Sequence, residues 1–460
     1  MPTPAIVSSF ASLLQPFARC FTRPSYASFV DLVSGWLLQR GRHTTTRVVQ
    51  AAQKVGEKHL CSFHRFWSRA RWSPDAVGRV LVEQIALLQV RTSPAVAVAP
   101  ASPASPPQEP PLEAVVDDTL ARHQGQHIAS SGLHRDPLLS KKNRPLFHWG
   151  HVWVVVGLNV ALCGKTWCLP VLCRLYRSKT ACKRAGLVHR KKTELAAEMI
   201  RLLASWVPHR RVVVAGDGGY SNRTVMRDRP AKVDVVGRGW MNAALYAPPP
   251  PRQPGQMGRP RVRGAKLPTP AQQAADPKAP WTRVSVTVYG RTVRVQTLTI
   301  DALWYGACGS EEVRLVVVRG FPGHKKDDVF VATDPTMTPK QVIETYARRW
   351  PMEPTFHATK DLGLEDPQNR TEVAVRRTAP MALWVYSLVV LWYAKVGQSL
   401  PAAPCAKLPW DRPDRGVCFA DMLETLRRAS WVERLSAGVE WSGALRKALD
   451  PLLDAVASAA

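Results

Sequence analysis

The stretch Leu112–Asp118, LEAVVDD, combines apolar residues with two adjacent acids at its end. Short runs of apolar and β-branched residues are typical of β-strands, so this stretch is expected to be a strand that ends in acid. Similar patterns follow at His151–Val160 (HVWVVVGLNV) and at Lys165–Val171 (KTWCLPV), where Pro170 lies near the end of the strand. The region is therefore expected to begin with three strands.

A helix and a fourth strand continue this pattern. Glu194–Trp206 repeats apolar residues at helical spacing, and Thr193 is expected to cap the helix. Val212–Ala215 is continuously apolar, as in a strand buried on both faces, and it leads to Gly216 and Asp217. The order of elements, with acids after the first and fourth strands, resembles an RNase H-like domain. The fold class expected is an α/β (α+β) RNase H-like mixed sheet flanked by helices.

Composition and hydrophobic periodicity divide the whole chain of 460 residues into segments. A Pro/Ala/Ser-rich linker is the clearest boundary, because such a composition buries little apolar surface. The predicted segments are an N-terminal helical, DNA-binding domain (1–92), the linker (93–111), an RNase H-like catalytic core in two parts (112–229 and 339–398), a β-rich insertion with a Pro/Arg-rich loop (230–338) and a C-terminal helical tail (399–460). A helix-turn-helix-like unit and a plain helical bundle are equally open for the first segment.

The charge balance points to a polyanionic partner. The chain has 63 Lys and Arg against 35 Asp and Glu, a net charge of +28, which favours nucleic acid first and an anionic membrane surface second. The apolar run Thr378–Ala394 is short for a membrane span and contains Pro380, so a buried core helix is expected. No signal peptide pattern is found, and the expected location is the bacterial cytoplasm, associated with the nucleoid.

The nine cysteines do not favour a metal site of their own. No CxxC pair occurs, and zinc ribbons and fingers need such close pairs, so no zinc is expected. A disulfide framework is not expected either, which leaves free thiols as the simple interpretation.

Three acids have the sequence context of a divalent metal site: Asp118 and Asp217 at strand ends, and Glu353 in YARRWPMEPTFHATK. Phosphodiester chemistry needs hard oxygen ligands, because Mg²⁺ prefers carboxylates and water. Two such ions activate the attacking oxygen and stabilise the leaving one. With about 100° of rotation per residue, Glu353, His357 and Lys360 project from one helix face. Pro351 suits a first helical position, so a new helix that begins there would separate Tyr346 and Arg349 from this face.

The spacing of Tyr346, Arg349, Glu353 and Lys360 matches the Y-(2)-R-(3)-E-(6)-K signature of one branch of bacterial insertion-sequence DDE transposases. The chain also resembles that branch at VVDDT (Val115–Thr119) and at GDGGYS (Gly216–Ser221). The resemblance covers roughly residues 113–395. It implies an RNase H-like core with a β-strand insertion, and DNA cleavage at the element ends with joining of the 3′-OH ends to target DNA. Mg²⁺, with Mn²⁺ as a substitute, would act as two ions per site.

The same resemblance implies roles for particular residues. In this branch the first catalytic Asp directly precedes Thr, which selects Asp118 over Asp117. Asp118, Asp217 and Glu353 would bind the metal, and Tyr346, Arg349 and Lys360 would contact DNA phosphates. Members act on double-stranded DNA, at terminal inverted repeats and at the target, as homodimers or larger synaptic complexes. Some flip a base against aromatic residues, for which the insertion offers Trp240, Trp281 and Trp304, each more often a core residue.

The predicted function is therefore a transposase, a Mg²⁺-dependent DNA endonuclease and strand transferase. Two alternatives remain open from the sequence. One is a DNA-binding protein derived from such an element that no longer cuts DNA, against which the intact set of acids argues. The other is an RNase H-like repair or recombination nuclease, which would act on branched DNA or hybrids without joining ends.

Overall fold

The computed structural model describes residues 6–92, 109–136, 139–141, 143–252, 257–401, 416–436 and 443–458. The predicted linker at 93–111 lies outside the described residues except for its last three.

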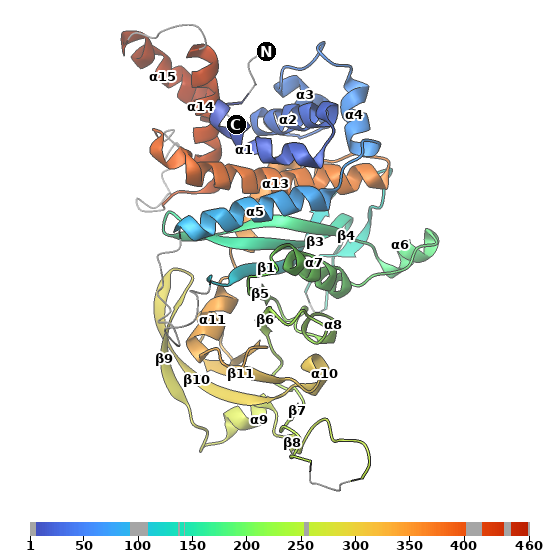
Figure 1. The fold of residues 1–460 in the computed structure, drawn as a ribbon, viewed down its shortest axis with the longest axis vertical. Helices are drawn as coiled ribbons and strands as arrows, with labels where there is room; N and C mark the ends of the chain where they lie inside the picture. Colours follow the sequence, from blue (N-terminus) through green and yellow to red (C-terminus); the bar gives the residue numbers. More distant parts are fainter. Residues whose placement is uncertain are drawn as a thin grey trace.

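One mixed β-sheet runs through the molecule (Figure 1). Its strands lie in the order β2-β3-β1-β5-β6-β12-β11-β10-β7-β8, with β4 paired to β3 and β9 paired to β10. The bounds are β1 (Leu112–Arg122), β2 (Gly132–Arg135), β3 (Phe147–Leu162), β4 (Lys165–Tyr176), β5 (Val212–Gly216), β6 (Val233–Arg238), β7 (Leu245–Tyr246), β8 (Lys266–Leu267), β9 (Thr282–Val288), β10 (Arg291–Leu303), β11 (Glu312–Arg319) and β12 (Asp328–Ala332).

The first five core strands have the directions of an RNase H-like sheet. β3 is antiparallel to β1 and to β4, whereas β5 is parallel to both β1 and β6. All five residues of β5 are buried, as its continuous Val-rich sequence predicts. Val116 pairs with Gly216, the last residue of β5, whereas β1 continues to Arg122, so the predicted end of the first strand at the acids is wrong. Asp117 therefore lies within β1, beside the point at which β5 ends and Asp217 follows. The fold is a mixed α/β protein consistent with the expected class.

Pro170 alters the pairing of β4 with β3. Gly157 pairs with Pro170 and Val156 pairs with Leu172, so Val171 is an extra residue on β4. A proline has no N–H to donate to a ladder and is tolerated at bulges and edge strands. Strand β4 pairs with β3 alone in the described sheet, and beyond the bulge it continues to Tyr176, five residues past the predicted end.

The helix before β5 begins earlier than predicted. α7 spans Lys192–Trp206, and its N-cap is Lys191 rather than Thr193. The Glu194 carboxylate accepts a hydrogen bond from the backbone N–H of Lys191 at 2.7 Å. Glu194 thereby satisfies one of the N–H groups that a helix start leaves without an intrahelical partner, so the predicted Thr193 cap is wrong.

Most helices form a layer on one side of the sheet. Figure 1 shows α5 and α13 on one side of β3 and β4, and α7 on the other. The remaining bounds are α1 (Ser8–Leu14), η1 (Gln15–Cys20), α2 (Arg23–Leu38), α3 (Thr45–Ala51), α4 (Leu60–Ser68), α5 (Pro74–Thr92), α6 (Lys179–Arg184), α8 (Arg223–Met226), α9 (Pro270–Ala275), α10 (Tyr305–Cys308), α11 (Pro339–Ala347), α12 (Met352–Thr359), η2 (Lys360–Leu364), α13 (Glu372–Lys395), η3 (Gly397–Ser399), α14 (Phe419–Ser436) and α15 (Gly443–Ser458).

Helix α13 is the centre of this layer. It contacts α2, α4, α5, α14 and β4, and the predicted buried helix at Thr378–Ala394 is confirmed. By length and composition α13 also qualifies as a membrane span, but 83% of its most apolar window is buried within the protein. The helices of residues 6–92 share one continuous apolar core with α13 and the sheet, so they form one of its covering layers.

The insertion extends the catalytic sheet. β6, which the sequence places at the start of the insertion, pairs in parallel with β5, and β12 continues from β6 in antiparallel pairing. A second apolar cluster lies between these strands and α11. Through this cluster, the insertion supports the segment that carries Tyr346 and Arg349.

Candidate active site

Two aspartates meet where β1 and β5 run side by side. Asp117 is largely buried, and its Oδ2 accepts a hydrogen bond from Arg349 Nη1 at 2.7 Å. Asp217 follows β5, and its Oδ1 accepts the N–H of Gly219 at 2.9 Å, which fixes the carboxylate in the turn. Burial raises the pKa of Asp117 to about 7, with Arg349 opposing the shift and Asp217 adding to it. Even with Arg349 beside it, the pKa of Asp117 stays near neutral, so a further positive charge at this place would favour the ionised carboxylate.

Arg349 joins the β1 acid to the third predicted acid. Its Nη1 binds Asp117, and its Nη2 donates to Glu353 Oε1 at 2.9 Å. The guanidinium also lies 5.9 Å from the centre of the Tyr346 ring. Of the predicted site residues, Arg349 contacts Asp117 directly and Asp217 is near enough to act on its charge, whereas Glu353 and Tyr346 are linked to Asp117 through Arg349.

The helix around Glu353 is broken, as Pro351 suggested. α11 ends at Ala347, and α12 begins at Met352. Arg349 lies in the connection, which lets its side chain reach both the β1 acid and Glu353 in the first turn of α12. The break therefore places Arg349 between the two carboxylates, whereas an unbroken helix would have put it on the Glu353 face alone.

Asp118 has a different set of partners. Tyr220 donates its hydroxyl to Asp118 Oδ1 at 3.0 Å, and Lys192 Nζ lies 2.6 Å from Asp118 Oδ2. Adjacent residues of a strand point to opposite faces, which explains why the two acids do not share partners. Tyr220 belongs to the GDGGYS motif, whereas no sequence signal marked Lys192.

Lys360 and His357 pair with acids other than the three predicted metal ligands. α12 ends at Thr359, and the chain continues as a π-type turn in which Gly363 has a φ of 84°. Lys360 pairs with Glu365 at 3.4 Å, and the largely exposed His357 pairs with Asp361 at 3.4 Å.

The family described as DDE superfamily endonuclease matches residues 16–303, more than half of the chain. The chain belongs to this family. As a DDE superfamily endonuclease it is expected to act on DNA as a transposase-like nuclease. The match contains the aspartates of β1, Asp217 after β5 and the N-terminal helices from residue 16, so it begins before the region that resembles the insertion-sequence branch. It ends before Glu353, whose place rests on the spacing signature and on Arg349. No match was found among curated proteins.

DDE superfamily endonucleases typically use divalent metal ions, and the chemistry of this site fits such an ion. Asp117, Asp217 and Glu353 offer hard oxygen donors, and a divalent cation would compensate the buried charge of Asp117. Among the described residues, no three His, Cys, Asp or Glu side chains lie close enough together to hold a metal ion in their present positions. The Arg349 guanidinium binds both Asp117 and Glu353 and neutralises part of their charge where a cation would otherwise do so.

None of the three tryptophans that the sequence suggested is linked to these acids by a recorded contact, whereas two other half-exposed aromatic residues lie on the Glu353 side. Trp304 is buried, and Trp281 packs under the guanidinium of Arg319; Trp240 is half exposed. Tyr289 and Trp350 are both half exposed, with ring centres 6.2 Å apart, and the charge of Glu353 acts on Tyr289. The dipeptide Tyr289-Gly290 joins β9 to β10 with φ of 53° and 74°, a tight hairpin turn.

Proposed function

We propose that the protein is a transposase that cleaves DNA at the ends of an insertion sequence and joins the 3′-OH ends to target DNA. The observation that carries this proposal is the link through Arg349 between a β1 acid and Glu353, beside Asp217. Family membership supplies the endonuclease class. The four-residue signature, two members of which contact each other at the acids, supports the insertion-sequence branch.

The proposed metal ligands are Asp117, Asp217 and Glu353, with Asp117 in place of the adjacent Asp118. Asp117 shares Arg349 with Glu353 and lies in the field of Asp217, whereas Asp118 contacts Lys192 and Tyr220. Mg²⁺ ions bound there would activate the attacking oxygen and stabilise the leaving oxygen of the phosphodiester. Asp118 is then a positioning residue, which orients Tyr220 and Lys192 through its two carboxylate oxygens.

The protein's own groups hold the DNA strand. The Arg349 guanidinium would pair with a non-bridging phosphate oxygen in fork geometry. Tyr346 donates a hydrogen bond to the same backbone, and Lys360 neutralises a phosphate as a point charge. In cleavage, water attacks phosphorus and the bond to the 3′ oxygen breaks; in joining, that 3′-OH attacks a target phosphate and displaces another 3′ oxygen.

The proposal includes an assembly and a location. Pairing two element ends requires two active sites, so a homodimer or larger complex on terminal repeats and target DNA is proposed. A net charge of +28 supports association with the bacterial nucleoid in the cytoplasm.

The test uses a plasmid that carries the gene with its native flanking DNA, incubated with the full-length protein and Mg²⁺. The wild-type protein is expected to release 3′-OH ends at flanking repeats and to form joined products. Asp117→Asn should lower cleavage by about a thousandfold, since a lost metal contact costs several kcal/mol of barrier. The matched variant Asp118→Asn should stay within about tenfold of wild type.

Each other outcome has a clear meaning. Undiminished cleavage by Asp117→Asn, with loss in Asp118→Asn, would return the first ligand to Asp118. DNA binding without any cleavage by the wild-type protein would replace the proposal with a silent DNA-binding protein. Cleavage of branched DNA without joined products would replace it with a repair nuclease.

A further inference from the structure

A strongly basic segment projects from the sheet between β4 and α7. Residues 177–192, here called the basic arm, read RSKTACKRAGLVHRKK and contain seven Lys and Arg residues and no acid. The arm contains the short helix α6, which extends away from the body of the molecule (Figure 1). Such a concentration of one sign of charge costs stability through self-repulsion, so a polyanionic partner is its simplest explanation.

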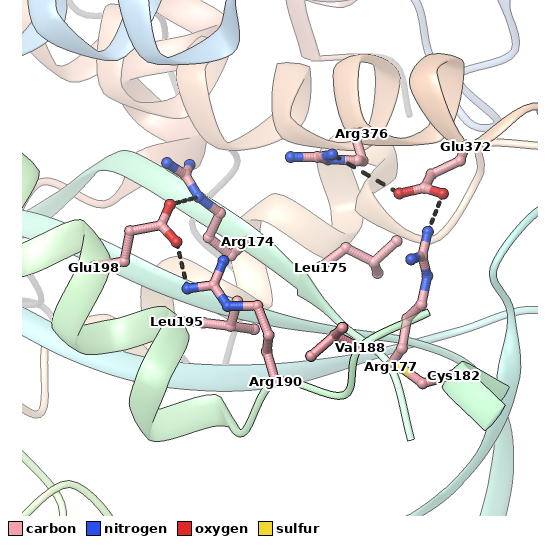
Figure 2. A pocket seen from close by; sticks show the side chains of 10 residues that line it. All are labelled: Arg174, Leu175, Arg177, Cys182, Val188, Arg190, Leu195, Glu198, Glu372 and Arg376. Carbon is pink, nitrogen blue, oxygen red and sulfur yellow. Dashed lines mark hydrogen bonds and ion pairs between the residues drawn. The ribbon is translucent and has the colours of Figure 1, made fainter. Parts of the chain in front are cut away.

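The root of the arm is tied to the body by ion pairs. Arg177 pairs with Glu372 of α13, and Arg190 pairs with Glu198 of α7. Figure 2 shows both arginines turned toward these acids around a cavity of about 160 Å³. Arg174, at the end of β4, pairs with the same Glu198 at 2.9 Å. These contacts position the arm and leave its outer cations for another role.

The outer cations are exposed and are not neutralised by the described part of the chain. Lys183, Arg184 and Lys191 are exposed, as is Lys179, and none of the described acids lies within 4.0 Å of them. Leu187 and Val188, which lie between them in sequence, are also exposed, and Val188 lines the cavity at the root of the arm (Figure 2). Exposed Lys and Arg side chains without acidic partners suit the phosphates of a polyanion.

The arm ends at the candidate active site. Its last residue, Lys192, places Nζ 2.6 Å from Asp118 Oδ2 and 5.7 Å from the centre of the Tyr176 ring. Asp118 also accepts the hydroxyl of Tyr220, on which the charges of Asp117 and Asp217 act, so one end of this basic track lies near these acids. A polyanion that follows the arm inward is therefore delivered to the site at which a phosphate would react.

We infer that the basic arm binds duplex DNA next to the reacting phosphate, through backbone contacts from Lys179, Lys183, Arg184 and Lys191. The inference rests on the proposed function, because it takes DNA as the substrate. It goes beyond that function by assigning a binding surface that neither the spacing signature nor the strand-end acids include. A general attraction by the net charge, in which these four cations have no special part, is the competing explanation.

The main experiment measures binding of the full-length protein to a fluorescein-labelled 40-base-pair duplex by anisotropy, in EDTA, over a salt series. In Lys183→Ala/Arg184→Ala/Lys191→Ala, affinity should fall at least about tenfold and the slope of log K against log salt should fall by about 2 to 3. The control Arg201→Ala/Lys278→Ala/Lys340→Ala removes three equally exposed cations from separate elements and should change affinity by less than about threefold. Equal losses in the two triple variants would overturn the inference.

Trypsin protection of the wild-type protein gives a second readout that needs no variant to fold. The duplex should slow cleavage after Lys183, Arg184 and Lys191, and cleavage after Lys278 should continue at its free rate. Unchanged cleavage within the arm at saturating duplex would overturn the inference. Binding in EDTA does not depend on catalysis, so loss of the arm effect leaves the plasmid cleavage test of the proposed function untouched.

Discussion

The contact between Arg349 and Asp117 predicts a specific energetic coupling. The two side chains are joined at 2.7 Å and are only 17% and 16% exposed, and Arg349 also binds Glu353 at 2.9 Å. A hydrogen bond between charged groups contributes about 1.5–3 kcal/mol. Removing one member of a buried pair costs more, about 3–5 kcal/mol, because an uncompensated charge remains. Arg349→Met alone is therefore expected to destabilise the metal-free protein by about 3 kcal/mol at pH 8.

A double-mutant cycle separates this contact from general effects of Arg349→Met. Combined with Asp117→Asn, the variant should show a coupling energy of about 2 kcal/mol, because Asn leaves no charge to be stranded. Combined with Asp118→Asn it should show less than about 0.5 kcal/mol, since Asp118 contacts Lys192 and Tyr220. The assay is urea unfolding in EDTA. Equal coupling for the two acids would refute the assignment of Arg349 to Asp117.

The pH dependence of this cycle has a defined sign. The folded-state pKa of Asp117 is raised by burial to about 7, above its ordinary value of 3.8. The neutral acid is thus favoured on folding, and the stability present below pH 4 is lost as the pH rises toward 7. At pH 5 Asp117 takes up a proton in the folded protein, so the measured coupling with Arg349 should shrink.

Two further predictions concern the scaffold. Burial, with a contribution from the neighbouring His123, lowers the pKa of His151 to about 3. Stability present above pH 6.5 should therefore be lost as the pH falls, by up to about 1.4 kcal/mol per pH unit. In urea unfolding at pH 7.5 and 5.5, His151→Gln should lose less free energy of unfolding between the two pH values than the wild type, and an equal loss would contradict the prediction. A Cβ at Gly78 of α5 would lie 2.4 Å from the carbonyl oxygen of Val171, so Gly78→Ala should destabilise the protein by about 1–3 kcal/mol. Gly306→Ala, where nothing lies within 4 Å, should be neutral in the same unfolding assay, and a neutral Gly78→Ala would show that α5 does not pack tightly on β4.

The order of the core elements could be predicted because each has a strong local pattern. β1, β3, β4, α7 and β5 lie where apolar runs and helical periodicity placed them. The start of α7 could not be predicted, because Thr193 and Lys191 compete for the cap and Glu194 decides in favour of Lys191. The position of the bulge at Val171 depends on how β4 pairs with β3, which is a tertiary property.

The contacts of the site residues depend on long-range packing and could not be predicted from the sequence. Alternation along β1 separates Asp117 from Asp118, but only the arrangement of Arg349 shows which acid faces Glu353. The break between α11 and α12 was anticipated from Pro351, whereas its effect on Arg349 was not. Lys192 and Tyr289 belong to no sequence motif, and only the fold shows that Lys192 contacts Asp118 and that Tyr289 lies near Glu353.

The most direct test of the account is divalent metal binding by the protein alone, without DNA. Mn²⁺ is titrated into the wild-type protein, Asp117→Asn and Asp118→Asn, and free Mn²⁺ is measured by electron paramagnetic resonance. The account predicts that Asp118→Asn binds Mn²⁺ as the wild type does, and that Asp117→Asn binds at least about tenfold more weakly. Wild-type binding by Asp117→Asn, with loss in Asp118→Asn, would contradict the proposed metal site.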